Sequence, residues 1–381
     1  MPSGQLIYLD YAATTPLDPA VLETMRPYLE GAFGNAASRH HRLGLEAASA
    51  VEVAREQVAT LLGADPREIY WTSGATESNN LALKGVAAAP AYGQRRHIVT
   101  VRTEHKAVLD PCASLEAVGY EVTYLGVDGE GRLDVDALAD ALRDDTLLVS
   151  VMHANNELGV LHPVEGIGAL CRERGVVFHT DAAQTFGKEA IDVEACSIDL
   201  LSFSAHKIYG PKGAGGLYVR RRGPRVRCEP LLHGGGHEKG LRSGTLNVPG
   251  VVGLGAAAAL ASSTMSDEQE RIRGLRDHFE RELLARVDGL LVNGGARPRV
   301  AGLLNVSFVG IDAEALLESM PDLAASTAAA CSSATRQPSY VLGAMGMPDA
   351  RVRGSVRFSL GRFTTRDEID RAMVMIEALG S

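Results

Sequence analysis

Short apolar runs alternate with helical patterns between about residues 65 and 220. Several of these runs are continuously apolar, which is typical of strands in a parallel sheet covered on both faces. The alternation predicts an α/β layered domain built on a mainly parallel, seven-stranded sheet. The predicted strands are 68–72, 97–101, 121–125, 147–152, 176–179, 200–204 and 216–220. Helices are predicted between them at 75–88, 134–143 and 164–174.

The pattern changes after a glycine-rich stretch at residues 233–245, HGGGHEKGLRSGT. Before the strand region, helices are predicted at 19–30 and 44–62. Beyond the glycine-rich stretch we expect a long alanine-rich helix, two strands and two more helices, at 251–286, 304–308, 355–360, 313–319 and 365–379. This second region predicts a smaller α+β domain.

Composition and charge narrow the function. The 381 residues are 45% hydrophobic and 22% charged, as in a folded chain that can bury its own core. The net charge of −9 gives no attraction to a polyanion, so we expect no direct nucleic-acid partner. Because the N-terminus lacks a signal pattern and no apolar run reaches the length of a membrane span, we expect a cytoplasmic protein without a membrane segment.

The cysteines argue against a metal site and against a disulfide framework. They are odd in number, far apart and free of C-x-x-C pairs, at Cys112, Cys171, Cys196, Cys228 and Cys331. Cys112, Cys171 and Cys196 need no special explanation, because most cysteines are small buried hydrophobes. Cys331 differs because it lies among small and polar neighbours, in the stretch AAACSS. An accessible thiolate there could reach a substrate, although a structural cysteine is the alternative.

Polar groups follow five of the predicted strands directly. In an open α/β sheet ligands bind at the carboxyl ends of the strands, so these groups predict one composed site. They are Ser73-Gly74-Ala75-Thr76, Glu104-His105, Asn155-Asn156-Glu157, Asp181-Ala182-Ala183-Gln184 and Ser204-Ala205-His206-Lys207.

Each group also has an ordinary structural interpretation. The helix that begins after Gly74 could bind a phosphate at its N-terminus, or could merely be capped. Lys207 could form a Schiff base with a carbonyl cofactor, or extend to solvent. Asp181 could pair with a protonated ring nitrogen, or cap a helix. His105 could stack on a planar ring or act as an acid or base, or be a hydrogen-bonded core residue.

Taken together, the motifs resemble the class V, fold-type I pyridoxal-phosphate (PLP) enzymes, and among them the bacterial cysteine desulfurases of the NifS/IscS type. The resemblance extends in order over nearly the whole chain. It rests on YLDYAATTP, FGNAASRHHRLG, TSGATESNN, TEHKAVLD, VMHANNELG, HTDAAQ, SFSAHKIYGPKG, HGGGHEKGLRSGT, the Cys331 segment with PSYVL, and VRFSLGRFT.

The resemblance implies a role for each motif residue. Lys207 would bind the cofactor covalently and move the substrate's α-proton, and Cys331 would receive the sulfur as a persulfide. Asp181 would pair with the pyridine nitrogen, His105 would stack on the ring, and Gln184 would bind the ring hydroxyl. The implied phosphate ligands are Ala75, Thr76, Ser204 and His206, with Thr245 from a neighbouring subunit. The implied ligands of the substrate carboxylate are Asn156 and Arg357.

The resemblance also implies the organisation of the chain. Residues 1–15 would associate with the small domain, 16–255 would form the large PLP-binding domain, and 256–381 would form the small domain that carries the catalytic cysteine. The implied enzyme is a homodimer that converts L-cysteine to L-alanine and passes sulfur to an acceptor protein in iron–sulfur cluster assembly, tRNA thiolation or DNA phosphorothioation. An aminotransferase or a selenocysteine lyase of the same class is the alternative. Ala328 and Ala329 before the cysteine, and Arg336-Gln337 after it, depart from the family's pattern and leave the acceptor open.

Overall fold

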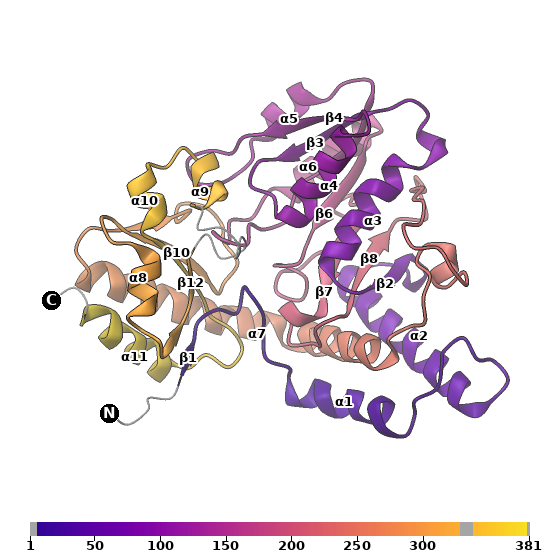
Figure 1. Cartoon of the computed structure of the whole chain (residues 1–381), viewed down its shortest axis with the longest axis horizontal. Helices are drawn as coiled ribbons and strands as arrows, with labels where there is room; N and C mark the ends of the chain where they lie inside the picture. Colours follow the sequence, from indigo (N-terminus) through magenta and orange to yellow (C-terminus); the bar gives the residue numbers. More distant parts are fainter. Residues whose placement is uncertain (1–5, 328–337, 379–381) are drawn as a thin grey trace.

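A seven-stranded sheet forms the centre of the larger part of the molecule (Figure 1). The computed structural model describes residues 6–327 and 338–378. Four strand pairs are parallel, and only β8 runs antiparallel to both of its neighbours. The strand order is β2 (Ile69–Thr72), β8 (Gly215–Val219), β7 (Leu200–Ser204), β6 (Val177–Asp181), β5 (Thr146–Ser150), β3 (His97–Val101) and β4 (Glu121–Leu125). The prediction of a mainly parallel seven-stranded sheet is therefore confirmed.

Helices cover both faces of this sheet because successive side chains of a strand point to opposite faces. Ile98 packs in the core under α3 (Ala75–Ala87) and α4 (Lys106–Glu116), whereas its neighbour Val99 packs in the core on the other face. The helices on that other face are α2 (Arg42–Leu62), α5 (Val135–Ala141), α6 (Val164–Arg174) and the first half of α7 (Val248–Arg286). With both faces covered, the strand ends are the exposed part of the sheet.

Helix α7 joins the two hydrophobic cores of the molecule. Its first half packs on the large sheet and on α1 (Pro19–Glu30), while Ile272, Phe279 and Leu283 in its second half belong to the core of the smaller part. The boundary expected near residue 256 falls inside this helix, and the division into domains stays a prediction. By length and composition α7 could cross a membrane, but 56% of its most apolar window is buried inside the protein, as in a core helix.

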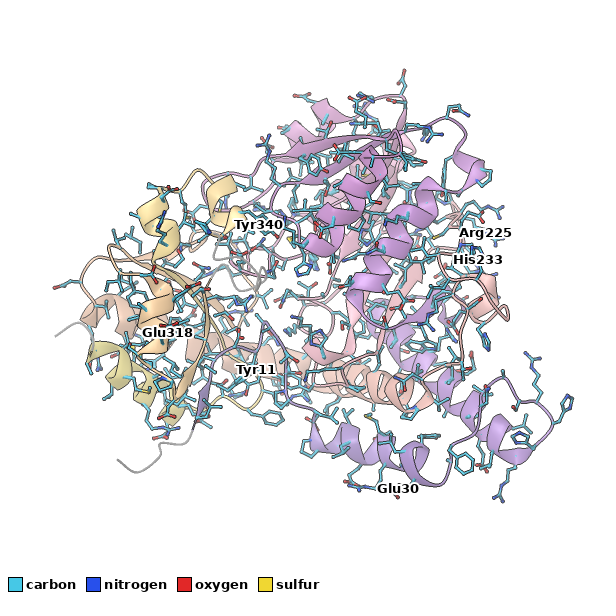
Figure 2. The ribbon with its side chains drawn as sticks, in the orientation of Figure 1. Tyr11, Glu30, Arg225, His233, Glu318 and Tyr340 are labelled. Carbon is cyan, nitrogen blue, oxygen red and sulfur yellow. The ribbon has the colours of Figure 1, made fainter. Side chains whose placement is uncertain are left out.

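The smaller part is built on a four-stranded antiparallel sheet. Its order is β12 (Ser326–Thr327), β13 (Ser355–Ser359), β10 (Leu303–Phe308) and β9 (Leu290–Asn293). The N-terminal strand β1 (Ile7–Tyr8) pairs in parallel with β11 (Leu323–Ala324), and Ile7 packs in the same core. The accompanying helices are α8 (Ala313–Glu318), α9 (Tyr340–Ala344), α10 (Asp349–Arg353) and α11 (Arg366–Glu377). Tyr340 lies where this part meets the large sheet (Figure 2).

The close packing of α6 gives a test of the fold. A Cβ atom added at Gly168 would lie 1.9 Å from the carbonyl oxygen of Cys196, so Gly168→Ala should destabilise the protein by about 1–3 kcal/mol through overpacking. Gly274, on the exposed side of α7, has no atom within 4 Å of such a Cβ. Gly274→Ala should therefore leave stability unchanged or raise it by up to about 1 kcal/mol. Urea unfolding of both variants checks this, and equal stability of the two would contradict the described packing.

Candidate active site

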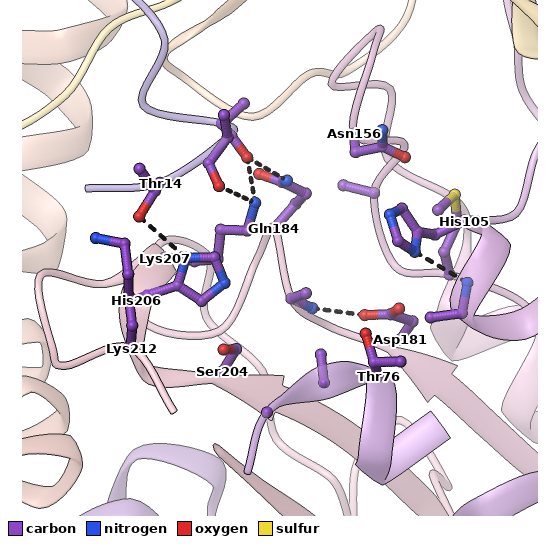
Figure 3. A pocket seen from close by; sticks show the side chains of 18 of the residues that line it. Thr14, Thr76, His105, Asn156, Asp181, Gln184, Ser204, His206, Lys207 and Lys212 are labelled. Atoms are coloured by element: carbon purple, nitrogen blue, oxygen red, sulfur yellow. Dashed lines mark hydrogen bonds between the residues drawn. The ribbon is translucent and has the colours of Figure 1, made fainter. Parts of the chain in front are cut away.

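The carboxyl ends of the parallel strands open into a cavity of about 640 Å³ (Figure 3). Strands β6 and β7 pair with Asp181 opposite Ser202, so Asp181 comes close to the turn Ala205–Lys207 that follows β7. The cavity wall brings together most of the predicted site residues: Ala75, Thr76, His105, Asn156, Asp181, Gln184, Ser204, His206, Lys207 and Arg357. Residues from both parts of the molecule therefore share one pocket.

Lys207 lies against the N-terminal segment of the chain. Its Nζ donates hydrogen bonds to the carbonyl oxygens of Ala12 and Ala13, the latter at 2.8 Å. The segment is fixed in turn by Thr15, whose backbone N–H and hydroxyl both donate to the carbonyl of His206, at 2.9 and 3.0 Å. These contacts hold the lysine amine at the wall of the cavity, where a carbonyl compound can reach it.

Asp181 is 6% exposed and has a donor on each carboxylate oxygen. Asn79 Nδ2 donates to Oδ2 at 2.6 Å, and the N–H of Ala183 donates to Oδ1 at 2.8 Å. Glu104 lies nearby and is fully buried, and burial together with the charge of Asp181 raises the pKa of Glu104 well above its ordinary value. Glu104 does not line the cavity, so of these two carboxyl groups the one that faces it is that of Asp181.

His105 presents a neutral ring to the same cavity. Its Nδ1 accepts a hydrogen bond from the N–H of Ala107 at 3.1 Å, as the N-cap of α4, so the ring proton is on Nε2. Burial, aided by the charge of Lys207 and opposed by that of Asp181, lowers the pKa of His105. Figure 3 shows His105 and Asp181 on one side of the cavity, with Lys207 and His206 across from them.

The N-terminus of α3 forms a cradle for an anion. Gly74 is its N-cap, and no side chain in the described part of the chain caps the helix, so backbone N–H groups of the first turn are available to a ligand. A Cβ atom on Gly215 of the adjacent strand would lie 2.5 Å from Gly74 Cα, so glycine is needed for this close approach. Ser204 and Lys212 line the same cavity and add a hydroxyl and a positive charge. A phosphate group matches this set of donors.

Arg357 enters the cavity from strand β13 of the smaller part. It is 4% exposed, and its Nη1 and Nη2 donate to the Asn156 carbonyl at 2.9 Å and to Asp10 Oδ1 at 2.8 Å. Its buried Nε donates to no atom of the described part of the chain. A guanidinium held in this way can bind a carboxylate through two hydrogen bonds.

Gln184 contributes an acceptor that no described residue uses. Its Nε2 donates to the carbonyl of Ala12 at 3.0 Å, whereas its buried Oε1 receives no hydrogen bond from residues 6–327 or 338–378. A buried polar atom without a partner is costly, so this oxygen is suited to a ligand hydroxyl.

The sequence and the structure match known proteins over nearly their whole length. The family described as aminotransferase class-V matches residues 7–372. The chain belongs to this family. A cysteine desulfurase IscS from Shewanella sp. (strain ANA-3) is 54% identical over 373 residues, which are 97% of this chain and 91% of that protein.

Two solved structures extend the comparison. A NifS-like protein superposes with a TM-score of 0.91 at 38% identity, covering 98% of this chain and 99% of the other. SspA in complex with cysteine superposes with a TM-score of 0.82 at 39% identity, covering 94% of this chain and 99% of the other. The predicted resemblance and the fold-type I architecture are thus confirmed.

As a class-V aminotransferase family member the chain uses pyridoxal 5′-phosphate as its cofactor. The residues present fit this group. The uncapped α3 N-terminus suits a phosphate, the unsatisfied oxygen of Gln184 suits a ring hydroxyl, and the Asp181 carboxylate suits a protonated ring nitrogen.

One predicted site residue lies apart from this cavity, and one lies outside the described part of the chain. Thr245 is exposed and does not line the cavity of its own chain, so its role in a neighbouring subunit stays a prediction. The nearby Arg242 is tied to the cavity residue Glu77, with Nε 2.8 Å from Oε1. Cys331 lies outside the described residues, although Ser326, a few positions before it, lines the cavity.

Several residues that shape the site were not predicted from the sequence. Asn79 orients Asp181, the carbonyls of Ala12 and Ala13 hold Lys207, and Lys212 adds charge beside the cradle. Each lies inside a motif that carried the family resemblance, but none follows a predicted strand directly. The strand-end rule therefore could not select them.

The contact between Asn79 and Asp181 gives a test of the site. Asn79→Ala removes a donor to a buried carboxylate and should weaken PLP binding to the apoenzyme roughly tenfold. A PLP titration followed by absorbance measures this. Asn80→Ala is the matched control, because among the described residues Asn80 Nδ2 bonds only the carbonyl of Thr76 in its own helix, at 3.0 Å. Equal affinities of the two variants would show that Asn79 does not support the cofactor site.

Proposed function

We propose that this protein is a PLP-dependent cysteine desulfurase that converts L-cysteine to L-alanine and transfers the sulfur, through a persulfide on Cys331, to an acceptor protein. The observation that carries the proposal is one cavity that holds Lys207, Asp181 and Arg357 together. The relatives named cysteine desulfurase support this activity over an aminotransferase or a selenocysteine lyase.

The cavity residues divide into ligands of the cofactor and ligands of the substrate. Lys207 binds PLP covalently, Asp181 lies at its ring nitrogen, His105 stacks on its ring, and Gln184 binds its ring hydroxyl. Asn156 and Arg357 bind the carboxylate of the substrate, which is supported by the buried Arg357 guanidinium. The phosphate is bound by Ala75, Thr76, Ser204 and His206, and by Thr245 of a second copy in a homodimer.

His206 binds the phosphate as a neutral hydrogen-bonding group. Burial, with the charges of Lys207 and Lys212, lowers the pKa of His206 to about 4. Its Nδ1 lies 3.1 Å from Thr14 Oγ1, which fixes the ring orientation.

The chemistry follows from these positions. When bound, PLP withdraws electrons from the substrate, so that the Cα–H bond can break. Lys207 takes the α-proton, and Arg357 holds the carboxylate so that this proton faces the amine. The Cys331 thiolate then attacks the substrate sulfur. An S–S bond forms, the Cβ–S bond breaks with its electron pair going to carbon, and the protonated product leaves as alanine.

The acceptor of the sulfur is a protein that presents a nucleophile to the persulfide. The net charge of −9 disfavours direct binding of a nucleic acid. The proposed enzyme acts as a homodimer in the cytoplasm. The cytoplasmic location is supported by the free thiols of the described cysteines Cys112, Cys171, Cys196 and Cys228, because a reducing compartment keeps cysteines unpaired.

Two substitutions separate the proposed steps. Cys331→Ser should abolish sulfur release from L-cysteine, by at least about 100-fold, but keep the exchange of the alanine α-proton with solvent, because that exchange needs no thiol. Lys207→Ala should lose both. Proton NMR in D₂O and a sulfide assay measure the two activities.

Cys196→Ser is the control, since Cys196 does not line the cavity and should keep both activities. Full sulfur release by Cys331→Ser would contradict the proposed role of Cys331.

A further inference from the structure

Glu157 is a buried carboxyl that the proposed chemistry does not use. It follows Asn156 directly, is 2% exposed, and forms no ion pair with a lysine or arginine of the described chain within salt-bridge distance. Burial raises the pKa of Glu157 to about 7, although a hydrogen bond from Ser339 and the charge of Arg357 oppose this. Burial of a carboxyl costs free energy, so we expect Glu157 to have a specific role beyond packing.

The hydrogen-bond partner of Glu157 is Ser339, which follows closely on residues 328–337, the segment that contains Cys331. Ser339 Oγ donates to Glu157 Oε2 at 2.5 Å, and the same hydroxyl accepts the N–H of Leu342 at 3.1 Å as the N-cap of α9. Glu157 is itself fixed, because its N–H donates to Asn155 Oδ1 at 2.9 Å and its carbonyl accepts from Asn305 Nδ2 at 3.1 Å. Because the backbone of Glu157 is held in this way, its carboxyl fixes the position at which α9 starts.

A second contact joins the same two regions. Tyr340 Oη donates to the carbonyl of Glu104 at 2.6 Å, and Lys106 Nζ lies 4.8 Å from the centre of the Tyr340 ring. Glu104 and Glu157 are the sequence neighbours of His105 and Asn156, respectively. The two loops that carry these cavity residues therefore also hold residues 339–340.

The other side of the Cys331 segment begins at the same cavity. Ser326 lines the cavity and pairs with Arg357, and Thr327 pairs with Val356. Cys331 comes four residues after Thr327, a distance that an extended chain covers in at most about 14 Å. The residues on both sides of the Cys331 segment, 326–327 and 339–340, are thus held by the strand or loops that carry the proposed ligands of the substrate carboxylate and of the cofactor ring.

We propose that Glu157 is a positioning residue for sulfur transfer, which by binding Ser339 fixes where the chain leaves the Cys331 segment relative to the bound substrate. This inference rests on the proposed function. It assigns the Glu157–Ser339 contact to the step in which Cys331 attacks the substrate sulfur, and not to cofactor binding or α-proton removal.

The test compares two rates in the holoenzyme. Glu157→Ala and Ser339→Gly each remove the contact, and glycine is well tolerated at an N-cap, so α9 is kept in the second variant. In both, single-turnover formation of the Cys331 persulfide, followed by mass spectrometry, should slow roughly tenfold. Exchange of the alanine α-proton in D₂O should stay within about twofold of the parent protein, because it does not involve Cys331.

Two further variants separate positioning from general loss of structure. Glu157→Gln keeps an oxygen that can accept from Ser339 and should recover most of the rate lost in Glu157→Ala. The double variant Glu157→Ala/Ser339→Gly should be no slower than either single variant, since both remove one shared contact.

Three results would overturn the inference. They are unchanged persulfide formation in Ser339→Gly, a parallel fall of proton exchange and persulfide formation, and additive effects in the double variant. A parent protein that exchanges the alanine proton but forms no persulfide on Cys331 would instead overturn the proposed function.

Discussion

The parallel pairing of neighbouring strands is the constraint on which the site depends. Because β5, β6 and β7 run in the same direction, their carboxyl ends lie at one edge, where the backbone ladder stops and side chains can turn into a shared cavity. The register between β6 and β7 places Asp181 opposite Ser202, and this sets its separation from Lys207 across the cavity. The carboxylate that we propose for the ring nitrogen and the amine that we propose for the carbonyl carbon are thus positioned by one set of backbone hydrogen bonds.

The smaller part completes the site through a few polar contacts. Arg357 bonds Asp10 and the carbonyl of Asn156, and Lys207 bonds the carbonyls of Ala12 and Ala13. The N-terminal segment therefore touches both the amine and the guanidinium. Because these contacts lie between two separate cores, the cavity depends on how the cores are held together, and both α7 and the N-terminal segment between β1 and α1 link them covalently.

The large sheet could be predicted from the sequence because most of its strands are continuous apolar runs, and their ends then selected residues such as Asp181 and Lys207. Short strands have too few residues for a pattern of apolar and polar positions to show. Strands β1 and β12 have two residues each, and β9 is a four-residue strand with an exposed centre. Helix α4 was missed, and it contains Pro111, which disfavours a helix in a sequence pattern. The local sequence of these elements does not determine their secondary structure, which is instead stabilised by tertiary packing.

Side-chain pairs between distant segments could not be predicted for a related reason. The contacts of Asn79 with Asp181 and of Glu157 with Ser339 span 102 and 182 residues, and nothing in the local pattern links the partners. Glu157 stood in one of the strand-end groups, but its contact with Ser339 follows only from the fold. The proposed role of Thr245 involves a second copy of the chain, so the structure of one chain does not test it.

The most direct test of this account is to find which lysine binds the cofactor. Reduction of the PLP-loaded protein with borohydride, followed by peptide mass spectrometry, marks that lysine permanently. Lys207 and Lys212 both line the cavity, so the experiment distinguishes two real candidates. The account predicts the phosphopyridoxyl label on Lys207 alone, opposite Asp181. A label on Lys212, or an unlabelled Lys207 in protein that has bound PLP, would contradict it.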